Sequence, residues 1–268
     1  MPLQFKNLDI KYQNQRPVYD TIASQYKKIN ELPYRRYVEG YTYFNILGDI
    51  RGKSILDLAC GEGFYTRQLK QKGAARVVGV DISPQMIALA KQEEARQPLG
   101  IEYVVGDALN LGKLGSFDLV VACYLLNYAQ TKTQLQQMCQ SIATNLKPGG
   151  RFVSINGNLE LPPEFYPRIK KYGYTKSIAG NLEESKPIKI IYCVDGETFS
   201  FDNYYLSQST YKQGFQEVGL EQMRWHRPGV SSEGAQRFGQ EFWQDFIKYP
   251  PLIGIECWKG NTACSEII

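Results

Sequence analysis

The segment at residues 54–66, Ser-Ile-Leu-Asp-Leu-Ala-Cys-Gly-Glu-Gly-Phe-Tyr-Thr, constrains the fold of this 268-residue chain more than any other. Its first six residues are mostly apolar and predict a buried parallel strand, and Gly61 and Gly63 predict a tight turn. A helix is expected over residues 64–72, because Gly73 follows it and ends helices readily. The segment therefore predicts a strand, a turn and a helix that begin an α/β fold.

A second apolar run at residues 77–81, Val-Val-Gly-Val-Asp, also ends in a carboxylate. Asp81 follows the glycine turn by about 20 residues, the spacing that places an acid at the tip of the neighbouring strand, within reach of ribose hydroxyls. The turn itself brings backbone N–H groups and a helix N-terminus close to a ligand, because glycine has no Cβ. Together the two runs predict a nucleoside-binding site.

The composition of the turn indicates which nucleoside is bound. A dinucleotide fingerprint needs a third glycine, but Thr66 stands at that position. Asp57 places a carboxylate just upstream, which would repel a pyrophosphate and would suit a ligand that carries an ammonium and a sulfonium. These residues argue against a nicotinamide-dependent oxidoreductase.

The motif series of the chain resembles that of class I S-adenosylmethionine-dependent methyltransferases. The wording of residues 56–67 and of 125–129, Leu-Leu-Asn-Tyr-Ala, is similar to toxoflavin-synthase-like bacterial small-molecule methyltransferases. The resemblance is dense from about residue 54 to 157 and implies S-adenosylmethionine as cofactor and S-adenosylhomocysteine as product. The matching motifs are Asp57-x-x-x-Gly61-x-Gly63, Asp81, Gly106-Asp107-Ala108 and Leu146-Lys-Pro-Gly-Gly150.

Strand and helix patterns alternate along the chain, which predicts an α/β fold with helices on both faces of a parallel sheet. Crossover helices are expected at residues 83–97 and 132–146. The resemblance implies a Rossmann-like seven-stranded sheet with six parallel strands and an antiparallel last strand. The strands are expected at residues 54–59, 76–80, 101–105, 117–123, 151–156, 221–227 and 252–258.

Four regions are expected around this sheet. Residues 1–50 form an N-terminal helical lid, with amphipathic helices at about 17–30 and 34–47. Residues 51–157 form the cofactor-binding core. Residues 158–207 form an antiparallel flap inserted after strand five, because Asp195-Gly196 between two β-like runs is a hairpin signal. Residues 208–268 complete the sheet and include a helix at 233–248.

The resemblance and the strand ends together assign the cofactor-binding residues. The turn is expected to hold the methionine part, Asp81 the ribose, Ile82 one face of the adenine and Asp107 its amino group. Arg36 is expected to pair with the methionine carboxylate from the lid. The full predicted set is Asp57, Ala59, Gly61, Gly63, Asp81, Ile82, Met86, Asp107, Ala108, Cys123, Tyr124, Tyr19, Tyr26 and Arg36.

The acceptor side is assigned from residue chemistry. His226 is the single histidine and lies near the carboxyl end of the sixth expected strand, where an imidazole could take a proton from the acceptor; a structural role stays open. Tyrosines of the lid and flap would enclose a small, flat or partly polar acceptor. The predicted catalytic residues are His226, Tyr205 and Asn127, and the predicted substrate residues are Tyr128, Asn156, Asn158 and Tyr166.

Composition narrows the partners. The net charge of +4 comes from interspersed acids and bases, so no phosphate-binding stripe is evident and nucleic acid is not expected as a partner. No apolar run approaches the roughly 18 residues of a membrane span, and six cysteines without a C-x-x-C pair are typical of reduced thiols. The chain is expected to be cytoplasmic, without a metal, and a monomer or homodimer.

The leading hypothesis is methyl transfer to nitrogen or oxygen, possibly carbon, of a small molecule in specialised metabolism. A nucleic-acid or protein methyltransferase is an alternative, although residues 122–128, Ala-Cys-Tyr-Leu-Leu-Asn-Tyr, lack the Asn/Asp-Pro-Pro-Tyr run usual in exocyclic-amine enzymes. A non-catalytic S-adenosylmethionine-binding protein is a further alternative.

Overall fold

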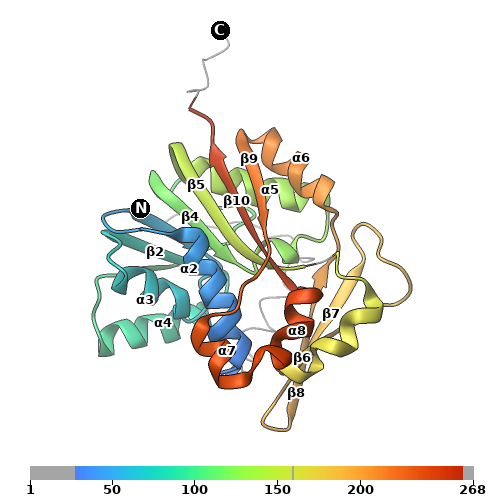
Figure 1. Cartoon of the computed structure of the whole chain (residues 1–268). Helices are drawn as coiled ribbons and strands as arrows, with labels where there is room; N and C mark the ends of the chain where they lie inside the picture. The colour runs from blue at the N-terminus through green and yellow to red at the C-terminus, as the bar shows by residue number, and fades with distance from the viewer. Residues whose placement is uncertain (1–27, 159, 262–268) are drawn as a thin grey trace.

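The computed structural model describes residues 28–158 and 160–261, and its centre is one twisted seven-stranded sheet (Figure 1). The strand order is β3-β2-β1-β4-β5-β10-β9. Only β10 is reversed, because it pairs antiparallel with both β5 and β9. The expected Rossmann-like sheet is thereby confirmed. The strands are β1 (Ser54–Leu58), β2 (Arg76–Asp81), β3 (Glu102–Val105), β4 (Phe117–Cys123), β5 (Leu146–Gly157), β9 (Leu220–His226) and β10 (Leu252–Lys259).

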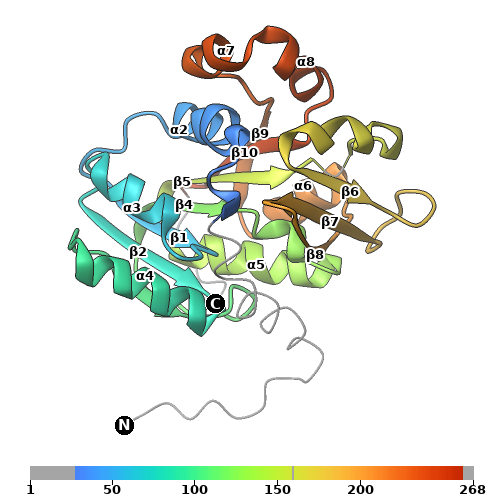
Figure 2. The same cartoon turned by 90° about the horizontal axis from the view of Figure 1, so that it is seen from below.

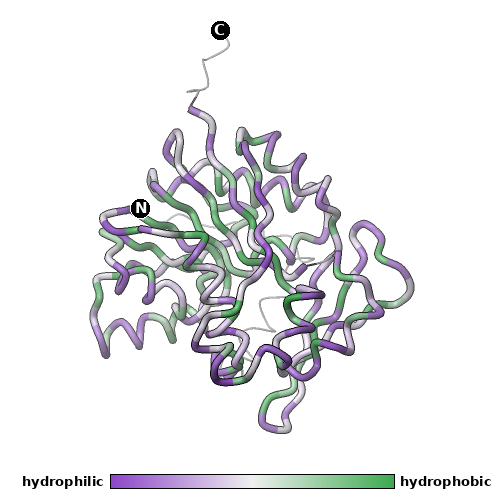
Figure 3. Tube along the Cα trace, in the orientation of Figure 1, coloured by the Kyte–Doolittle hydropathy of each residue, from purple (hydrophilic) through white to green (hydrophobic). Residues whose placement is uncertain are grey.

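Apolar residues on these strands point alternately to the two faces, because successive side chains of a strand do so. Each face therefore packs its own core, and the strands at the centre of the sheet are among the most hydrophobic parts of the chain (Figure 3). Ile55, Val77 and Leu119 join one core, whereas their neighbours Leu56, Val78 and Val120 join the other.

Helices cover both faces of the sheet. One core takes in α2, α3 and α4, and the opposite core takes in α5 and α6. Figure 2 shows α5 on one side of the sheet and α2, α7 and α8 on the other. The helices are α2 (Tyr41–Leu47), α3 (Phe64–Gln71), α4 (Pro84–Arg96), α5 (Lys132–Asn145), α6 (Gln208–Glu217), α7 (Ser232–Phe238) and α8 (Gln240–Lys248).

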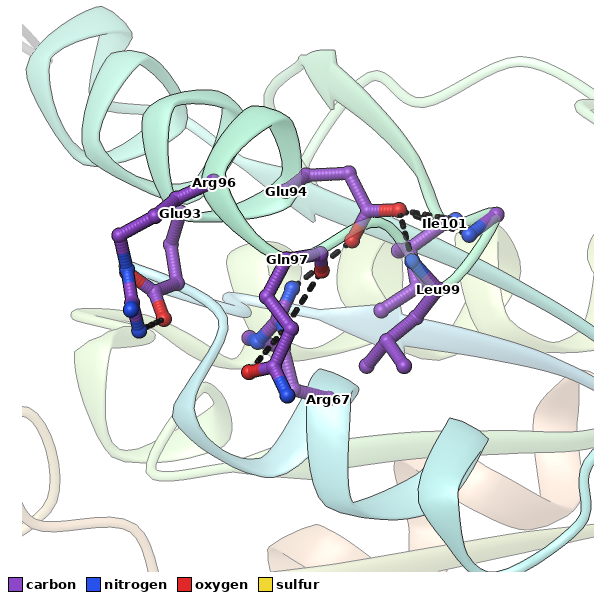
Figure 4. A network of polar contacts seen from close by, with 8 residues as sticks. Arg67, Glu93, Glu94, Arg96, Gln97, Leu99 and Ile101 are labelled. Atoms are coloured by element: carbon purple, nitrogen blue, oxygen red, sulfur yellow. Dashed lines mark hydrogen bonds and ion pairs between the residues drawn. The ribbon is translucent and has the colours of Figure 1, made fainter.

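A polar network fixes α3, the helix that follows the glycine turn, against the end of α4 (Figure 4). Arg67 donates to Glu94 Oε2 at 2.8 Å and to the Gln97 carbonyl at 2.8 Å. The other oxygen of Glu94 accepts backbone N–H groups from residues 99–101. Because the Arg67–Glu94 pair is largely buried, its geometry holds α3 and the preceding turn in place.

The N-terminal part of the described chain crosses one face of the sheet as a nearly continuous helix. It comprises the π-helical segment η2 (Arg35–Gly40) followed directly by α2, in agreement with the helix expected at residues 34–47. Arg151 of β5 donates to the carbonyls of Ile46 and Leu47, which satisfies groups that a helix C-terminus leaves open. The earlier helix expected at residues 17–30 lies mostly outside the described residues.

A second, three-stranded antiparallel sheet follows β5 in the chain (Figure 1). Asp195 and Gly196 both have positive φ, 52° and 79°, and join β7 to β8, as the hairpin signal predicts. The third strand and the preceding 3₁₀ segment were not expected. The elements are η4 (Pro163–Tyr172), β6 (Tyr174–Ser177), β7 (Pro187–Val194) and β8 (Glu197–Tyr204).

The helix expected at residues 233–248 is two helices. Gly239 separates α7 from α8 with φ 80° and ψ 156°, a conformation that interrupts the helix and that glycine adopts readily. Trp243 then donates its indole N–H to the Gly234 carbonyl at 2.9 Å, which packs α8 back against α7. The aromatic residues of α8 face the core, as predicted for packing residues.

Candidate functional site

The turn between β1 and α3 has the backbone geometry that its glycines predict. Gly61 and Gly63 have φ values of 56° and 88°, and Ala59 also has a positive φ of 57°. A Cβ at Gly63 would collide with the hydroxyl of Tyr103, so only glycine fits there. A non-glycine residue in the left-handed region carries strain, which is commonly retained at binding sites.

Two acids lie at the carboxyl ends of adjacent strands beside this turn. Asp81 accepts the N–H of Gly61 at 2.8 Å with one oxygen and the N–H of Ser83 at 2.9 Å with the other. Asp57 is 3% exposed and accepts a hydrogen bond from the Thr66 hydroxyl at 2.6 Å. Burial, with a smaller contribution from the nearby Asp81 carboxylate, raises the pKa of Asp57 to about 7, although the hydrogen bond from Thr66 opposes the shift.

A cavity opens where these strands end. Its wall is formed by β1, the turn, the start of α4 and the end of β4. Eleven of the sequence-predicted residues line it: Asp57, Ala59, Gly61, Asp81, Ile82, Met86, Asp107, Ala108, Cys123, Tyr124 and Tyr128. Gly63 belongs to the turn but not to the lining. The chain thus brings the strand-end residues together, as expected for ligands bound beyond the carboxyl ends of parallel strands.

A buried cluster around Arg35 forms another part of the wall. Arg35 is 4% exposed, and its guanidinium carbon lies 5.7 Å from the ring centroid of Tyr65 and 5.6 Å from that of Tyr124. Glu39 accepts hydrogen bonds from Arg35, Tyr65 and Tyr124. Asn30 accepts from Arg35 at 2.9 Å, so the cation is held between two rings, a carboxylate and an amide.

Sequence reasoning missed this cluster. Arg35 and Glu39 are four residues apart on one helix, the spacing at which an arginine and a glutamate meet, and this signal could have found them. Arg36 was predicted instead as the partner of the methionine carboxylate. It is exposed, pairs with Glu233 at 3.0 Å and does not line the cavity. The predicted lid tyrosines Tyr19 and Tyr26 lie outside the described residues.

Other lining residues were also not predicted. They come from the glycine turn, from neighbouring strands and loops, and from helices. These residues are Cys60, Glu62, Phe64, Val80, Gly106, Leu109, Leu125, Gln130, Gln134 and Met138.

His226 lies at another corner of the sheet and does not line the cavity. Its Nε2 is 2.9 Å from Glu256 Oε2, and the other oxygen of Glu256 accepts from Arg151 at 2.9 Å. Arg151 in turn holds the end of α2. The position of His226 at the end of β9 was correctly predicted, but its contacts connect it to the anchoring of α2 and not to the cavity.

The three predicted asparagines lie outside the lining of the main cavity. Asn127 accepts the N–H of Gly157 at 2.9 Å and donates to its carbonyl at 3.3 Å, which joins η3 (Leu126–Tyr128) to β5. Asn158 donates to the Pro250 carbonyl at 2.8 Å. Asn156 and Asn158 line a second, much smaller cavity with Tyr211, behind η3. None of the three lines the main cavity.

Of the three tyrosines predicted for the acceptor side, one lines the main cavity and two do not. Tyr128 lines the main cavity and packs on Phe201 of β8, with ring centroids 6.1 Å apart. Tyr166 is buried in η4 beside Lys176, whose amino group lies 5.8 Å from its ring centroid. Tyr205, just after β8, is bonded through its backbone to Lys186 and is not part of the lining.

Similarity to known proteins concentrates on the part of the chain that forms this cavity. Residues 55–150 match the protein family described as a methyltransferase domain. The chain is 35% identical over 147 residues to a demethylmenaquinone methyltransferase of Lactococcus lactis, covering 52% of this chain and 56% of that protein. It is 38% identical over 108 residues to a ribosomal protein L11 methyltransferase of Burkholderia multivorans, covering 40% and 33%.

The chain thus spans between a third and just over half of the length of these relatives. The match to the methyltransferase-domain family is confined to residues 55–150.

Solved structures share the fold over most of the chain. A protein described as a putative S-adenosylmethionine-dependent methyltransferase from Listeria monocytogenes superposes with a TM-score of 0.60 and 21% identity, over 82% of this chain and 96% of that one. A complex titled DhpI-SAM-HEP superposes with a TM-score of 0.59 and 18% identity, over 94% and 99%. The fold is therefore that of S-adenosylmethionine-dependent methyltransferases.

Among the helices at residues 28–158 and 160–261, none has the combined length and apolar character that a membrane span requires.

Proposed function

We propose that this chain is a class I S-adenosylmethionine-dependent methyltransferase that acts on a nitrogen, oxygen or carbon atom of a small molecule. The observation that carries the proposal is the pairing of Asp57 and Asp81 at the ends of β1 and β2, on either side of a glycine turn in one cavity. Carboxylates at that place disfavour phosphate groups and favour a cationic nucleoside. The methyltransferase-domain match over residues 55–150 supports the same conclusion.

The residues of the cavity fit this cofactor. Asp81 is fixed at the end of β2 by two backbone N–H groups, where its carboxylate can accept hydrogen bonds from ribose hydroxyls. Ile82 and Met86 offer apolar surface to the adenine, and Asp107 and Ala108 complete that end. The turn from Ala59 to Gly63 offers backbone to the methionine part.

Arg35 is the residue we propose for the methionine carboxylate, in place of Arg36. Of the described residues that line the cavity, it alone has a cationic side chain. A guanidinium carries five donors in a planar fork, so it can serve a ligand carboxylate together with Glu39 and Asn30. The rings of Tyr65 and Tyr124 hold that fork in one orientation.

S-adenosylmethionine, when bound, supplies a methyl group already activated by a positive sulfur. The chain then needs mainly to position the two reactants and to exclude water, and positioning alone can lower a barrier by about 7 kcal/mol or more. Tyr124 and Tyr128 lie on the wall next to Cys123, at the end of β4, where an acceptor would approach. The strained φ of 64° at Tyr124 and its hydrogen bond to Glu39 hold that ring against the cavity.

We further propose that the acceptor belongs to specialised metabolism, on the resemblance of residues 56–67 and 125–129 to toxoflavin-synthase-like enzymes, and that the protein acts in the cytoplasm as a monomer or homodimer. A protein acceptor is the principal alternative, because one relative named above is a ribosomal protein methyltransferase. A labelling experiment distinguishes the two classes of acceptor.

In the test, the full chain is incubated with methyl-labelled S-adenosylmethionine and one class of acceptor at a time. The acceptors are metabolites made by enzymes that are encoded in its genomic neighbourhood, ribosomal protein, and RNA. Label is expected in the small-molecule fraction and absent with Asp81→Ala. Label in protein or RNA would replace the acceptor part of the proposal. Failure to bind the cofactor at all would overturn the whole of it.

A further inference from the structure

The two strand-end acids of the cavity differ in how their charge is stabilised. Asp81 receives two backbone N–H groups, one of them from Ser83 at the start of α4. Asp57 receives one neutral hydroxyl, from Thr66. Within residues 28–158 and 160–261, Asp57 makes no ion pair, and the cation of the wall, Arg35, is paired with Glu39.

Every titratable group that the structure places electrostatically beside Asp57 is acidic or neutral. Asp81 approaches from β2, Cys60 from the turn, Tyr43 from α2 and Tyr103 from β3. Cys123 approaches from β4. Each of these groups is neutral when protonated and negative after it loses its proton, so none can neutralise the Asp57 carboxylate.

We infer that Asp57 is a specificity-determining residue that makes the cavity prefer the positively charged methyl donor over the neutral thioether product. This inference rests on the proposed function. S-adenosylmethionine and S-adenosylhomocysteine share the adenosine, the amino group and the carboxylate, and differ by one methyl group and one positive charge. A buried carboxylate whose described neighbours include no cation responds directly to that charge.

The preference depends on pH through Asp57. Burial holds its pKa at about 7, so the carboxyl group is partly protonated at neutral pH. A ligand with an additional positive charge favours the ionised form, whereas a neutral sulfur does not. Discrimination in favour of the donor is therefore weak below the pKa, where Asp57 is protonated, and grows as pH rises through it.

The experiment measures dissociation constants of S-adenosylmethionine, S-adenosylhomocysteine and sinefungin, a charged analogue, by calorimetry on the full chain at pH 6 and pH 8. The variants are Asp57→Asn, which is nearly isosteric, and Asp49→Asn as a matched control. Asp49 is exposed, pairs with Arg51 and does not line the cavity, so its loss changes the net charge by the same amount at a place away from the cavity. The ligands' own amino groups titrate alike in all proteins, so the variants isolate the share of Asp57.

In the wild type, the ratio of the product's to the donor's dissociation constant is expected to rise by up to about tenfold from pH 6 to pH 8, with sinefungin following the donor. Asp57→Asn should flatten the rise, and Asp49→Asn should keep it. A ratio independent of pH in the wild type, or a rise retained in Asp57→Asn, would overturn the inference. If Asp57→Asn does not fold, a wild-type ratio that stays independent of pH still overturns the inference. Absence of binding by all three ligands would instead contradict the proposed function.

Discussion

Two corners of the sheet each bury a carboxylate, and the two carboxylates differ in their partners. Glu256, 5% exposed on β10, is matched by Arg151 and by His226, and Arg151 continues to the end of α2. Asp57, 3% exposed on β1, has only the Thr66 hydroxyl among the described residues and faces a cavity. A buried acid with a cationic partner such as Arg151 holds elements together, whereas one without such a partner marks a place for a cationic ligand.

The same contrast separates the two arginines of η2. Arg35 is enclosed by rings and by Glu39 in the cavity wall, and Arg36 pairs with Glu233 on the surface. Neighbours in sequence therefore differ in burial and in the environment of their charge. Substitutions that remove a charge near the cavity should therefore affect ligand affinity. Substitutions that remove a charge at the other corner or on the surface should leave ligand affinity unchanged.

The largest effect is expected from Asp81→Ala. The variant loses the proposed ribose contacts and also the N–H bonds that order Gly61 and Ser83. Charge-assisted hydrogen bonds contribute about 1.5–3 kcal/mol each, so affinity for S-adenosylhomocysteine should fall by a hundredfold or more. Calorimetric titration measures it, with circular dichroism to verify folding. Normal affinity in a folded Asp81→Ala protein would show that the ligand lies elsewhere.

At the other corner, Glu256→Gln should lower stability and leave cofactor affinity unchanged. Removing this carboxylate leaves Arg151 without its buried partner, at a cost of about 3 kcal/mol. Urea unfolding with and without S-adenosylhomocysteine separates the two effects. A variant with native stability would mean that the Glu256 network does not anchor α2.

Arg35→Gln should weaken binding of ligands with a carboxylate, whereas Arg36→Gln should not. The expected loss for S-adenosylhomocysteine is about tenfold, and it should be absent for 5′-methylthioadenosine, which lacks the amino-acid part. Comparing the two ligands on both variants removes any general effect on folding. Equal losses for the two ligands would assign Arg35 a structural role.

Because Lys176 is buried, the free energy of unfolding should depend on pH in the alkaline range. This lysine is 5% exposed, donates to the carbonyls of Asn158 and Pro251, and burial lowers its pKa to about 7. Above pH 7 the folded chain binds fewer protons here than the unfolded chain, so this group makes stability rise with pH until about 10.5, by at most about 1.4 kcal/mol per unit.

Urea unfolding of wild type and Lys176→Met from pH 7 to 10 measures that difference. The stability of the wild type relative to the variant should rise with pH. A constant difference between the two proteins across this range would contradict the assignment.

The smallest effect is expected from His226→Ala. The side chain is partly exposed and contributes one hydrogen bond, so stability should fall by about 1 kcal/mol. Cofactor affinity and turnover should change by less than about twofold, because His226 lies outside the cavity lining. A large loss of turnover at unchanged affinity would instead support the catalytic role that its place on the expected strand suggested.

The core of the fold was predictable because its signals are local. Apolar strands, Gly61 and Gly63, and the capping serine at Ser83 act within a few residues, so β1, α3 and α4 were placed to within one residue or two. Asp57 and Asp81 followed from the strand ends together with the resemblance of the motif series. The split of α7 from α8 depends on the conformation of Gly239, and isolated glycines are also tolerated inside helices.

The wall contributed by the N-terminal helix was harder to predict. Whether Arg35 or Arg36 points inward depends on the helix phase, and a π-helical turn shifts that phase relative to a regular α-helix. The roles of His226 and Asn127 depend on tertiary partners, Glu256 and Gly157, that lie 30 residues away in sequence. Residue type indicated what these side chains can do, and only the packing shows what they contact.

A crystal structure of the full chain with S-adenosylmethionine tests the central claim most directly. Density for S-adenosylmethionine is expected along the ends of β1 and β2. The ribose should lie on Asp81, the carboxylate near Arg35 and the positive sulfur on the side of Asp57. Density at any other place on the molecule, or a ligand with a phosphate bound preferentially in this cavity, would contradict it.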